Sequence, residues 1–246
     1  MEPIFRQTQT IEDIHVDRFG RLKPSTLLYF AQEAAGGHCQ ILKLDWETLA
    51  EKDLFWAVIR QKVEITRLPE RGETITVETW PMPTTRSAFP RATVAYDEKG
   101  EELFRVIGLW VLMNTKTRGM VLPAKSGVDL DGTLRGTELA APGSIAPMAL
   151  ENRTSRQVRF TELDRNGHMN NTRYLDWLVD LLPAEFHGNN PAKGFTICYL
   201  NEAKEGQKID LSWQVLDGPV LQVDAHREKT DVSGGKERVF AAQIAF

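Results

Sequence analysis

An acid, an amide and an imidazole lie within five residues of one another in the second half of this chain. Asp164, Asn166 and His168 alternate along the segment Asp-Arg-Asn-Gly-His, just ahead of a stretch with helical periodicity. A carboxylate can act as a base or orient a neighbour, an amide can hold a carbonyl oxygen, and an imidazole can transfer a proton near neutral pH. This combination predicts an acid–base site at the start of a helix.

The first half of the chain contains a matching segment without this chemistry. Residues 17–30 and 164–177 align at an offset of 147 residues, and Arg21 then stands opposite His168. We infer an internal repeat in which one half is active and the other supports it. The identical pairs are Asp17/Asp164, Arg18/Arg165, Gly20/Gly167 and Leu28/Leu175.

Each of these polar residues also has a purely structural interpretation. Asn170, or Asn171 beside it, can cap the following helix by accepting from a free backbone amide. Asp164 can tie down its turn, and a lone loop histidine is more often hydrogen-bonded than catalytic. These groups occur together in only one half. For His168 and Asn166 the catalytic interpretation is therefore as well supported as the structural one.

An amphipathic helix follows the polar segment in each half. The first helix is expected to begin at Pro24, which suits an opening turn, and to end at Gly36-Gly37. The second has its apolar stripe in 174–182 and is expected to stop at Pro183. The stripe of the first helix consists of Leu27, Leu28, Ala31, Ala34 and Ala35.

Strand-like runs follow each helix, and the short turns between them favour antiparallel neighbours. Residues 123–152 are rich in glycine and proline and show no sustained period, which indicates a linker. We therefore expect domains at 1–122 and 153–246, each one helix on an antiparallel sheet, in the α+β class. The runs are Phe55–Leu68, Thr74–Trp80, Ala92–Tyr96 and Leu103–Asn114, then Gly194–Ala203, Lys208–Val215, Val220–Arg227 and Arg238–Phe246.

The composition excludes several classes of partner. The chain has 246 residues, of which 41% are hydrophobic and 26% charged, and a formal net charge of −4. A pI near 5.8 without a basic run argues against nucleic-acid binding. No apolar run approaches the roughly 18 residues of a membrane span. The start shows no signal peptide, and two cysteines fit a reducing compartment. We expect a cytoplasmic protein.

Other kinds of active site fit the sequence poorly. None of the five histidines has metal-ligand spacing with another candidate ligand, and neither a phosphate-binding glycine loop nor Gly-x-Ser-x-Gly occurs. Cys198 falls in the same expected strand as Glu202, about 13 Å away, which is too far for one reacting centre. We therefore interpret Cys198 and Cys39 as structural, and expect no metal.

The polar segment resembles a known family signature. Residues 163–174, LDRNGHMNNTRY, resemble the D-x-N-x-H-V-N-N-x-x-Y signature of plant-type acyl-acyl carrier protein thioesterases. Residues 110–118, WVLMNTKTR, resemble that family's W-V-M-M-N-x-x-T-R, and Thr79-Trp80 adds support. The resemblance runs from about residue 5 to the C-terminus. The chain lacks the N-terminal extension of the plastid enzymes, which suggests a bacterial relative.

The resemblance implies two tandem hotdog domains, with the acyl chain bound by the first and catalysis in the second. It also implies hydrolysis of fatty acyl-acyl carrier protein to free fatty acid and holo-acyl carrier protein, in fatty acid biosynthesis, without a cofactor. Asp164, Asn166 and His168 match the signature, and Glu202 matches the acid of the family's Y-R-R-E-C segment. Ala203 replaces the cysteine of that segment, so a mechanism with this thiol as nucleophile cannot operate.

Water is therefore the expected nucleophile. A carboxylate in an apolar pocket becomes a stronger base, and Glu202 is the first candidate to draw a proton from water. Asn166 would hold the thioester carbonyl, His168 would orient water or Glu202 and could protonate the thiolate, and Asp164 would orient one of its neighbours. Which of Glu202, His168 and Asp164 is the base stays open.

The acyl chain needs an apolar tunnel, and the first half is expected to supply most of it. The length of chain accepted would depend on the side chains that close this tunnel. The residues expected to contact the substrate are Leu27, Leu28, Ala31, Trp56 and Trp80, together with Asn170.

Acyl carrier protein is acidic, so its docking surface is expected to be locally basic despite the net charge of −4. Solvated surface charge is the alternative interpretation of the same residues, and a homodimer is left open. The basic candidates are Arg153, Arg156 and Arg159 after the linker and Lys116 and Arg118 before it.

Two other functions remain open. An acyl-CoA thioesterase would share the fold and the chemistry with a different carrier. A non-catalytic acyl-binding module is favoured only by Ala203, whereas retention of the four polar groups weighs against it. A hotdog dehydratase is disfavoured because its H-x-x-x-x-G-x-x-P setting is absent.

Overall fold

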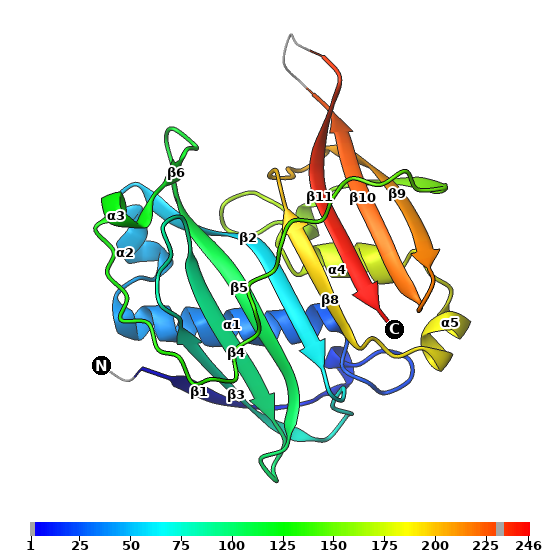
Figure 1. Cartoon of the computed structure of the whole chain (residues 1–246), viewed down its shortest axis with the longest axis horizontal. Coiled ribbons are helices and arrows are strands. Elements are labelled where there is room, and N and C mark those ends of the chain that lie inside the picture. The colour runs from blue at the N-terminus through cyan, green and yellow to red at the C-terminus, as the bar shows by residue number, and fades with distance from the viewer. Residues whose placement is uncertain (1–2, 230–233) are drawn as a thin grey trace. The chain divides into compact units, whose positions relative to one another are not determined.

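The computed structural model describes residues 3–229 and 234–246. The chain forms two compact units, Met1–Pro142 (unit 1) and Gly143–Phe246 (unit 2) (Figure 1). The boundary falls inside the glycine- and proline-rich stretch 123–152. Apart from helix α3 (Pro123–Ser126), this stretch is irregular until strand β7 begins at Asn152.

Unit 1 is an antiparallel sheet on which the long helix α1 packs (Figure 1). The strands lie in the order β1-β3-β4-β5-β2, with β6 paired to β5. Helix α1 contacts β1 and β3 through apolar side chains that are removed from water. The elements are β1 (Phe5–Thr10), the 3-10 turn η1 (Asp13–His15), α1 (Pro24–Leu42), α2 (Trp46–Ala50), β2 (Leu54–Ile65), β3 (Thr74–Pro81), β4 (Phe89–Tyr96), β5 (Glu102–Asn114) and β6 (Met120–Val121).

Unit 2 repeats this topology. Its strands lie in the order β7-β9-β10-β11-β8, which is the order of unit 1 with each strand replaced by its counterpart. The α+β class predicted from the sequence is therefore confirmed in both units. The elements are β7 (Asn152–Gln157), η2 (Phe160–Glu162), α4 (Arg173–Val179), α5 (Ala184–Asn189), β8 (Gly194–Tyr199), β9 (Lys208–Leu216), β10 (Val220–Glu228) and β11 (Lys236–Ala245).

The expected end of the first helix is wrong. Helix α1 continues through Gly36 and Gly37 to Leu42, and Lys43 ends it in the left-handed conformation with φ 59°. Gly37 has a packing role instead, because a Cβ there would lie 2.7 Å from Cζ of Phe5. The missing side chain lets β1 approach the helix closely.

The second helix is also shorter than expected. Helix α4 ends at Val179, and after Asp180 the amides of Leu181 and Leu182 bond three residues back, to the carbonyls of Leu178 and Val179. This tight turn leads to Pro183, after which α5 begins. The apolar stripe therefore continues beyond the last residue of the α-helix.

Strand β8 ends earlier than predicted, and the reason bears on the site. The amides of Leu200 and Asn201 both donate to the Val239 carbonyl, at 2.9 and 3.0 Å, so the ladder is bulged there. Glu202 lies beyond the strand, which corrects the expectation that it shares β8 with Cys198.

Candidate active site

The loop that carries the three polar residues is closed by its own main chain. The Asp164 amide donates to the His168 carbonyl at 2.7 Å, and the Gly167 amide donates to the Asp164 carbonyl at 3.0 Å. Gly167 has φ 74°, a conformation that glycine adopts without strain. Leu163 and Met169, which flank the loop, form an antiparallel β-bridge. The loop is thus a compact turn that leads into α4.

The Asp164 carboxylate holds this loop together. Its Oδ1 accepts from the amides of Asn166, at 2.8 Å, and His168, at 3.1 Å. Its Oδ2 accepts from Nδ2 of Asn166 at 3.3 Å. These bonds orient the Asn166 side chain and occupy the carboxylate, which indicates a positioning role for Asp164.

Unit 1 contains the same loop without the same chemistry. Asp17 Oδ1 accepts from the amides of Phe19, at 2.8 Å, and Arg21, at 3.1 Å, and the Asp17 amide donates to the Arg21 carbonyl at 2.8 Å. Gly20 has φ 79°. The loop frame therefore occurs in both units, whereas the amide and imidazole occur only in unit 2.

His168 and Glu202 meet in unit 2. The His168 Nε2 and Glu202 Oε2 atoms lie 3.1 Å apart, with side chains 12% and 34% exposed. A main-chain bond from the Met169 amide to the Ala203 carbonyl, at 2.8 Å, and a bridge between His168 and Lys204 join the loop to the segment after β8. This pairing places a carboxylate within hydrogen-bonding distance of an imidazole.

The same main-chain bonds in unit 1 identify the counterpart of Glu202. There the Leu22 amide donates to the Pro69 carbonyl at 2.9 Å, and Arg21 forms a bridge with Glu70. Leu68 consequently occupies the position of Glu202. Unit 1 has an arginine and a leucine where unit 2 has the imidazole and the carboxylate.

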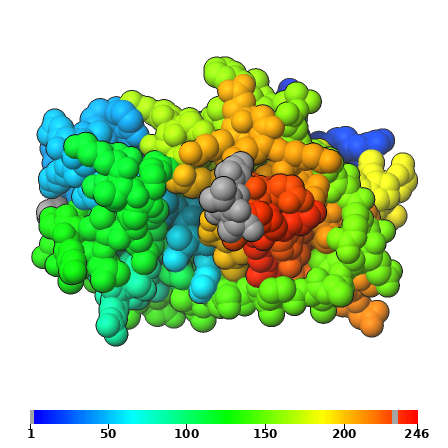
Figure 2. Space-filling model, turned by 90° about the horizontal axis from the view of Figure 1, so that it is seen from above, coloured from blue at the N-terminus to red at the C-terminus, as the bar shows by residue number. Residues whose placement is uncertain are grey.

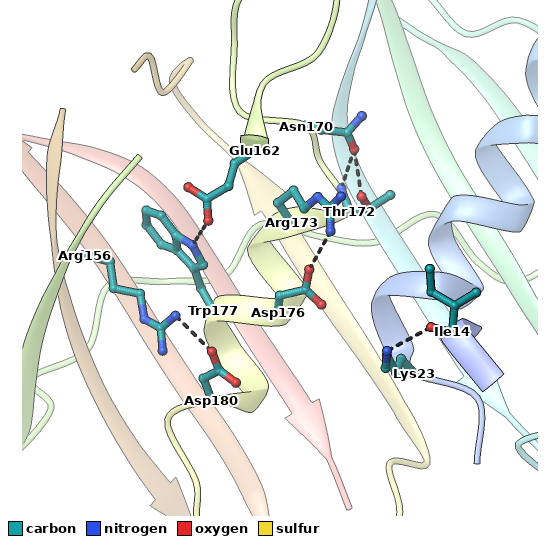
Figure 3. A network of polar contacts seen from close by, with 10 residues as sticks. All are labelled: Ile14, Lys23, Arg156, Glu162, Asn170, Thr172, Arg173, Asp176, Trp177 and Asp180. Carbon is teal, nitrogen blue, oxygen red and sulfur yellow. Dashed lines mark hydrogen bonds and ion pairs between the residues drawn. The ribbon is translucent and has the colours of Figure 1, made fainter. Parts of the chain in front are cut away.

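A second set of bonds attaches the loop to α4 (Figure 3). The Glu162 carbonyl accepts from the Asn170 amide at 2.8 Å, and Glu162 Oε1 accepts from Nε1 of Trp177 at 2.6 Å. Asn170 Oδ1 accepts from the Thr172 amide, at 3.0 Å, and from its hydroxyl, at 2.9 Å. Asn170 thus orders the entry to the helix, but the expectation that Asn170 or Asn171 is its N-cap is wrong, because Thr172 occupies that position without a side-chain capping bond. The contact of Asn170 with substrate stays a prediction.

The residue in place of the family cysteine is fully buried. Ala203 is 0% exposed, and its backbone hydrogen-bonds Tyr174, whose pKa burial raises well above the usual value. Cys198 is 1% exposed, packs with Ile145 and Ala241, and donates from Sγ to the Gly143 carbonyl. Ala203 and Cys198 are thus both core residues that pack against their neighbours.

The expected acyl-chain contacts of unit 1 lie in its interior. Leu27, Leu28 and Ala31 are buried on α1. Trp56 packs edge-on against Phe89, and Trp80 belongs to a separate apolar cluster with Ala92 and Val94. The two tryptophans thus line different parts of the unit 1 core.

Two further features are absent from the described part of the chain. No three side chains of His, Cys, Asp or Glu in residues 3–229 and 234–246 are grouped to hold a metal ion. Within the same ranges, no helix is both long and apolar enough to cross a membrane.

Family models match both halves of the chain. The acyl-ACP thioesterase N-terminal domain matches residues 2–124, and the acyl-ACP thioesterase C-terminal domain matches residues 146–239. The chain belongs to the acyl-ACP thioesterase family. This confirms the resemblance seen in the sequence.

Curated relatives in this family are chloroplast enzymes. An acyl-[acyl-carrier-protein] hydrolase of Cuphea viscosissima is 27% identical over 229 residues, covering 84% of this chain and 53% of the relative. A dodecanoyl-[acyl-carrier-protein] hydrolase of Cinnamomum camphora is 28% identical over 214 residues, covering 81% and 56%. The chain thus spans about half the length of the curated relatives it matches.

Solved structures of acyl-ACP thioesterases share the fold along the whole chain. One from Bacteroides thetaiotaomicron superimposes with a TM-score of 0.87 at 23% identity, covering 99% of this chain and 98% of the other. The 12:0-ACP thioesterase of Umbellularia californica gives 0.81 at 23% identity, covering 100% and 97%. At these identities the likeness establishes the fold.

Proposed function

We propose that the chain hydrolyses fatty acyl-acyl carrier protein to free fatty acid and holo-acyl carrier protein, in fatty acid biosynthesis. The observation that carries this proposal is the contact between His168 Nε2 and Glu202 Oε2, at 3.1 Å, beside an Asn166 amide that Asp164 orients. Family membership and the names of the relatives above support this substrate class.

Water is the nucleophile in the proposed reaction. Glu202 takes a proton from water while the oxygen attacks the thioester carbonyl carbon, and the Asn166 side chain stabilises the oxyanion. The carbon–sulfur bond then breaks, the proton that Glu202 took from water passes across the 3.1 Å contact to His168, and His168 donates it to the departing thiolate. The buried Ala203 methyl group supplies no competing nucleophile.

The identical strand order of the two units supports a tandem pair of hotdog domains. In this proposal residues 1–122 bind the acyl chain, residues 123–152 connect the domains, and residues 153–246 carry the catalytic groups. The buried α1 face with Leu27, Leu28 and Ala31 would supply the apolar contacts for the chain, together with Trp56 and Trp80.

The carrier protein would dock on basic side chains, several of which already have local partners. Arg156 pairs with Asp180 at 3.0 Å, and Arg153 donates to Ser212 at 2.8 Å. In unit 1 the turn between β5 and β6 packs on the segment after α2 at the surface (Figure 2), and there Lys116 pairs with Asp53 at 2.6 Å. These pairs would have to open or be shared on docking, which favours weak, salt-sensitive binding.

Release of thiol from acyl-acyl carrier protein by the purified chain tests the proposal. We expect turnover by the wild type and a loss of about 100- to 10,000-fold in kcat for Glu202→Gln, because the base is removed while the amide can still contact His168. Glu205→Gln, three residues further along the same turn, is the matched control and should keep normal turnover. Absence of wild-type activity would overturn the enzyme assignment.

The same assay separates the alternatives. Parallel rates with acyl-CoA and with acyl-acyl carrier protein of equal chain length decide the carrier, and a preference for acyl-CoA would overturn the proposed substrate. Tight binding of the acyl carrier without hydrolysis would identify a binding module.

A further inference from the structure

Arg227, on β10, makes hydrogen bonds to the turn that carries Glu202. Its Nη1 donates to the main-chain carbonyl of Glu202 and to Oε1 of Gln207. Its Nε donates to Oε1 of Glu237 at 2.8 Å, and its side chain is only 14% exposed. A largely buried guanidinium thus joins the sheet to the backbone of the proposed base.

Gln207 holds the other end of the same turn. We call the bonds that Arg227 and Gln207 make to this turn the clamp. Its Oε1 accepts from the Lys204 amide at 2.9 Å, as well as from Arg227. The guanidinium and the amide side chain therefore hold both ends of the segment 202–207. Between them, the Ala203 carbonyl accepts from the Met169 amide in the His168 loop. The clamp and the loop together determine where the Glu202 side chain begins.

The corresponding turn of unit 1 is held in a different way. There the amides of Thr66 and Arg67 both donate to the Leu103 carbonyl, which makes the bulge that matches Leu200 and Asn201. The Arg67 guanidinium donates to both oxygens of Glu73, at 2.7 and 2.8 Å. Its Nη2 also lies 3.8 Å from Asp97 Oδ2. Glu73 Oε1 accepts from the Glu70 amide at 2.6 Å, as Gln207 does from Lys204.

Matching main-chain bonds show which residues of the two turns correspond. The Ile11 amide donates to the Glu73 carbonyl in unit 1, and the Val158 amide donates to the Gln207 carbonyl in unit 2, so Glu73 and Gln207 are counterparts. In unit 1 the cation is Arg67, which lies in the turn and bonds to carboxylates. In unit 2 it is Arg227, which lies on strand β10 and donates to the main-chain carbonyl of Glu202.

We propose that Arg227 is a positioning residue of the thioesterase site. By fixing the main chain of Glu202, it holds the carboxylate within 3.1 Å of His168 Nε2. The inference rests on the proposed role of Glu202 as the base. Displacement of a catalytic group by about 1 Å can cost on the order of 100-fold in rate, so loss of this clamp should act on the chemical step.

Arg227→Met tests the inference, because it removes the donors and keeps an apolar stem of similar length. We expect kcat to fall about 10- to 100-fold while KM changes less than about threefold. Arg227→Lys, which offers one point charge in place of a planar fork, should restore part of the loss. Arg67→Met is the matched control, because it breaks the unit 1 clamp and should leave kcat per folded molecule unchanged.

A second readout is independent of turnover. The ring nitrogen signals of His168 in ¹⁵N-histidine NMR, assigned by their loss in His168→Ala, report its contact with Glu202. They should change in Arg227→Met and stay unchanged in Arg67→Met. Melting temperatures of both variants give the folded fraction for the rate comparison.

The outcomes separate the two proposals. An Arg227→Met protein that is folded and keeps the wild-type kcat would overturn the positioning role, as would equal losses of kcat in Arg227→Met and Arg67→Met. If the wild type releases no thiol, the proposed function falls. The His168 signals then decide the positioning role alone, and unchanged signals in Arg227→Met would overturn it.

Discussion

The indole of Trp177 donates to the Glu162 carboxylate at 2.6 Å, and this bond joins the turn before the Asp164–His168 loop to α4. At the same offset of 147 residues, unit 1 has His15 and Phe30, whose rings meet edge to face with centroids 5.0 Å apart. Both units therefore join the turn before the loop to the helix after it. They do so with different chemistry, a hydrogen bond in one and an aromatic contact in the other.

Removal of the Glu162 acceptor should destabilise unit 2. Trp177 is 2% exposed, so Glu162→Leu leaves its N–H without the acceptor that it has in a buried setting. We expect a loss of about 1–3 kcal/mol in the free energy of unfolding, measured by urea denaturation. Glu162→Gln keeps an oxygen acceptor and should lose less. Equal stability of the leucine variant and the wild type would contradict this role.

Asp164→Asn should retain most of the activity. The asparagine oxygen can still accept from the amides of Asn166 and His168, so the main chain of the loop keeps its shape, and only the longer bond from Asn166 Nδ2, at 3.3 Å, is lost with the charge. We expect kcat to fall less than about 10-fold, whereas loss of a general base costs about 100- to 10,000-fold. Asp17→Asn is the matched change in unit 1 and should leave kcat unaltered. A loss above 100-fold in Asp164→Asn would identify Asp164 as the base.

Ala203→Cys should not create a faster enzyme. The side chain at this position is fully buried, so the new sulfur would pack in the interior. We expect unchanged or lower kcat, together with a stability loss of up to about 3 kcal/mol from overpacking. Native-state labelling with a thiol reagent should not detect the new cysteine, although denatured protein would react at all three thiols. Rapid labelling or a burst of acyl-enzyme would contradict the prediction.

Alkaline pH should unfold unit 2 through its buried phenols. Burial raises the pKa of Tyr174 and of Tyr199 above the usual tyrosine value, whereas Tyr29 is exposed. Above about pH 10 the unfolded chain ionises these phenols while the folded chain keeps them protonated. Stability is therefore complete below this pH and falls as the pH rises. Absorbance at the phenolate band should rise for these tyrosines together with loss of circular dichroism. Tyr174→Phe should reduce the pH dependence.

The sequence alone predicts the repeat and the polar loop at Asp164–His168. Apolar periodicity located both helices, because burial of one face is a local property of the chain. The predicted end of α1 at Gly36-Gly37 is wrong because Gly37 is required by the approach of Phe5, which lies thirty-two positions earlier. The end of β8 was missed because its bulge is defined by the partner Val239.

Glu202 was identified only through family resemblance. Its segment has no period or spacing that points to the loop containing His168, and the contact depends on main-chain bonds between distant segments. Arg227 and Gln207 carry no sequence signal for the same reason, because their contacts with this segment form only in the fold. The contact between Glu162 and Trp177 could have been predicted from the sequence. At the offset of 147 residues both positions differ between the halves, with His15 and Phe30 in unit 1.

The bulge at Leu200 and Asn201 also separates the motions of the site from those of the sheet. Hydrogen bonding in the ladder stops before Glu202, so small excursions of the following turn do not require strands β8 and β11 to come apart. Segment 202–207 is instead held by Arg227 and Gln207, so its position depends on these side chains and not on the ladder of β8 and β11. The sheet and the segment that carries Glu202 can therefore lose their hydrogen bonds in separate local events.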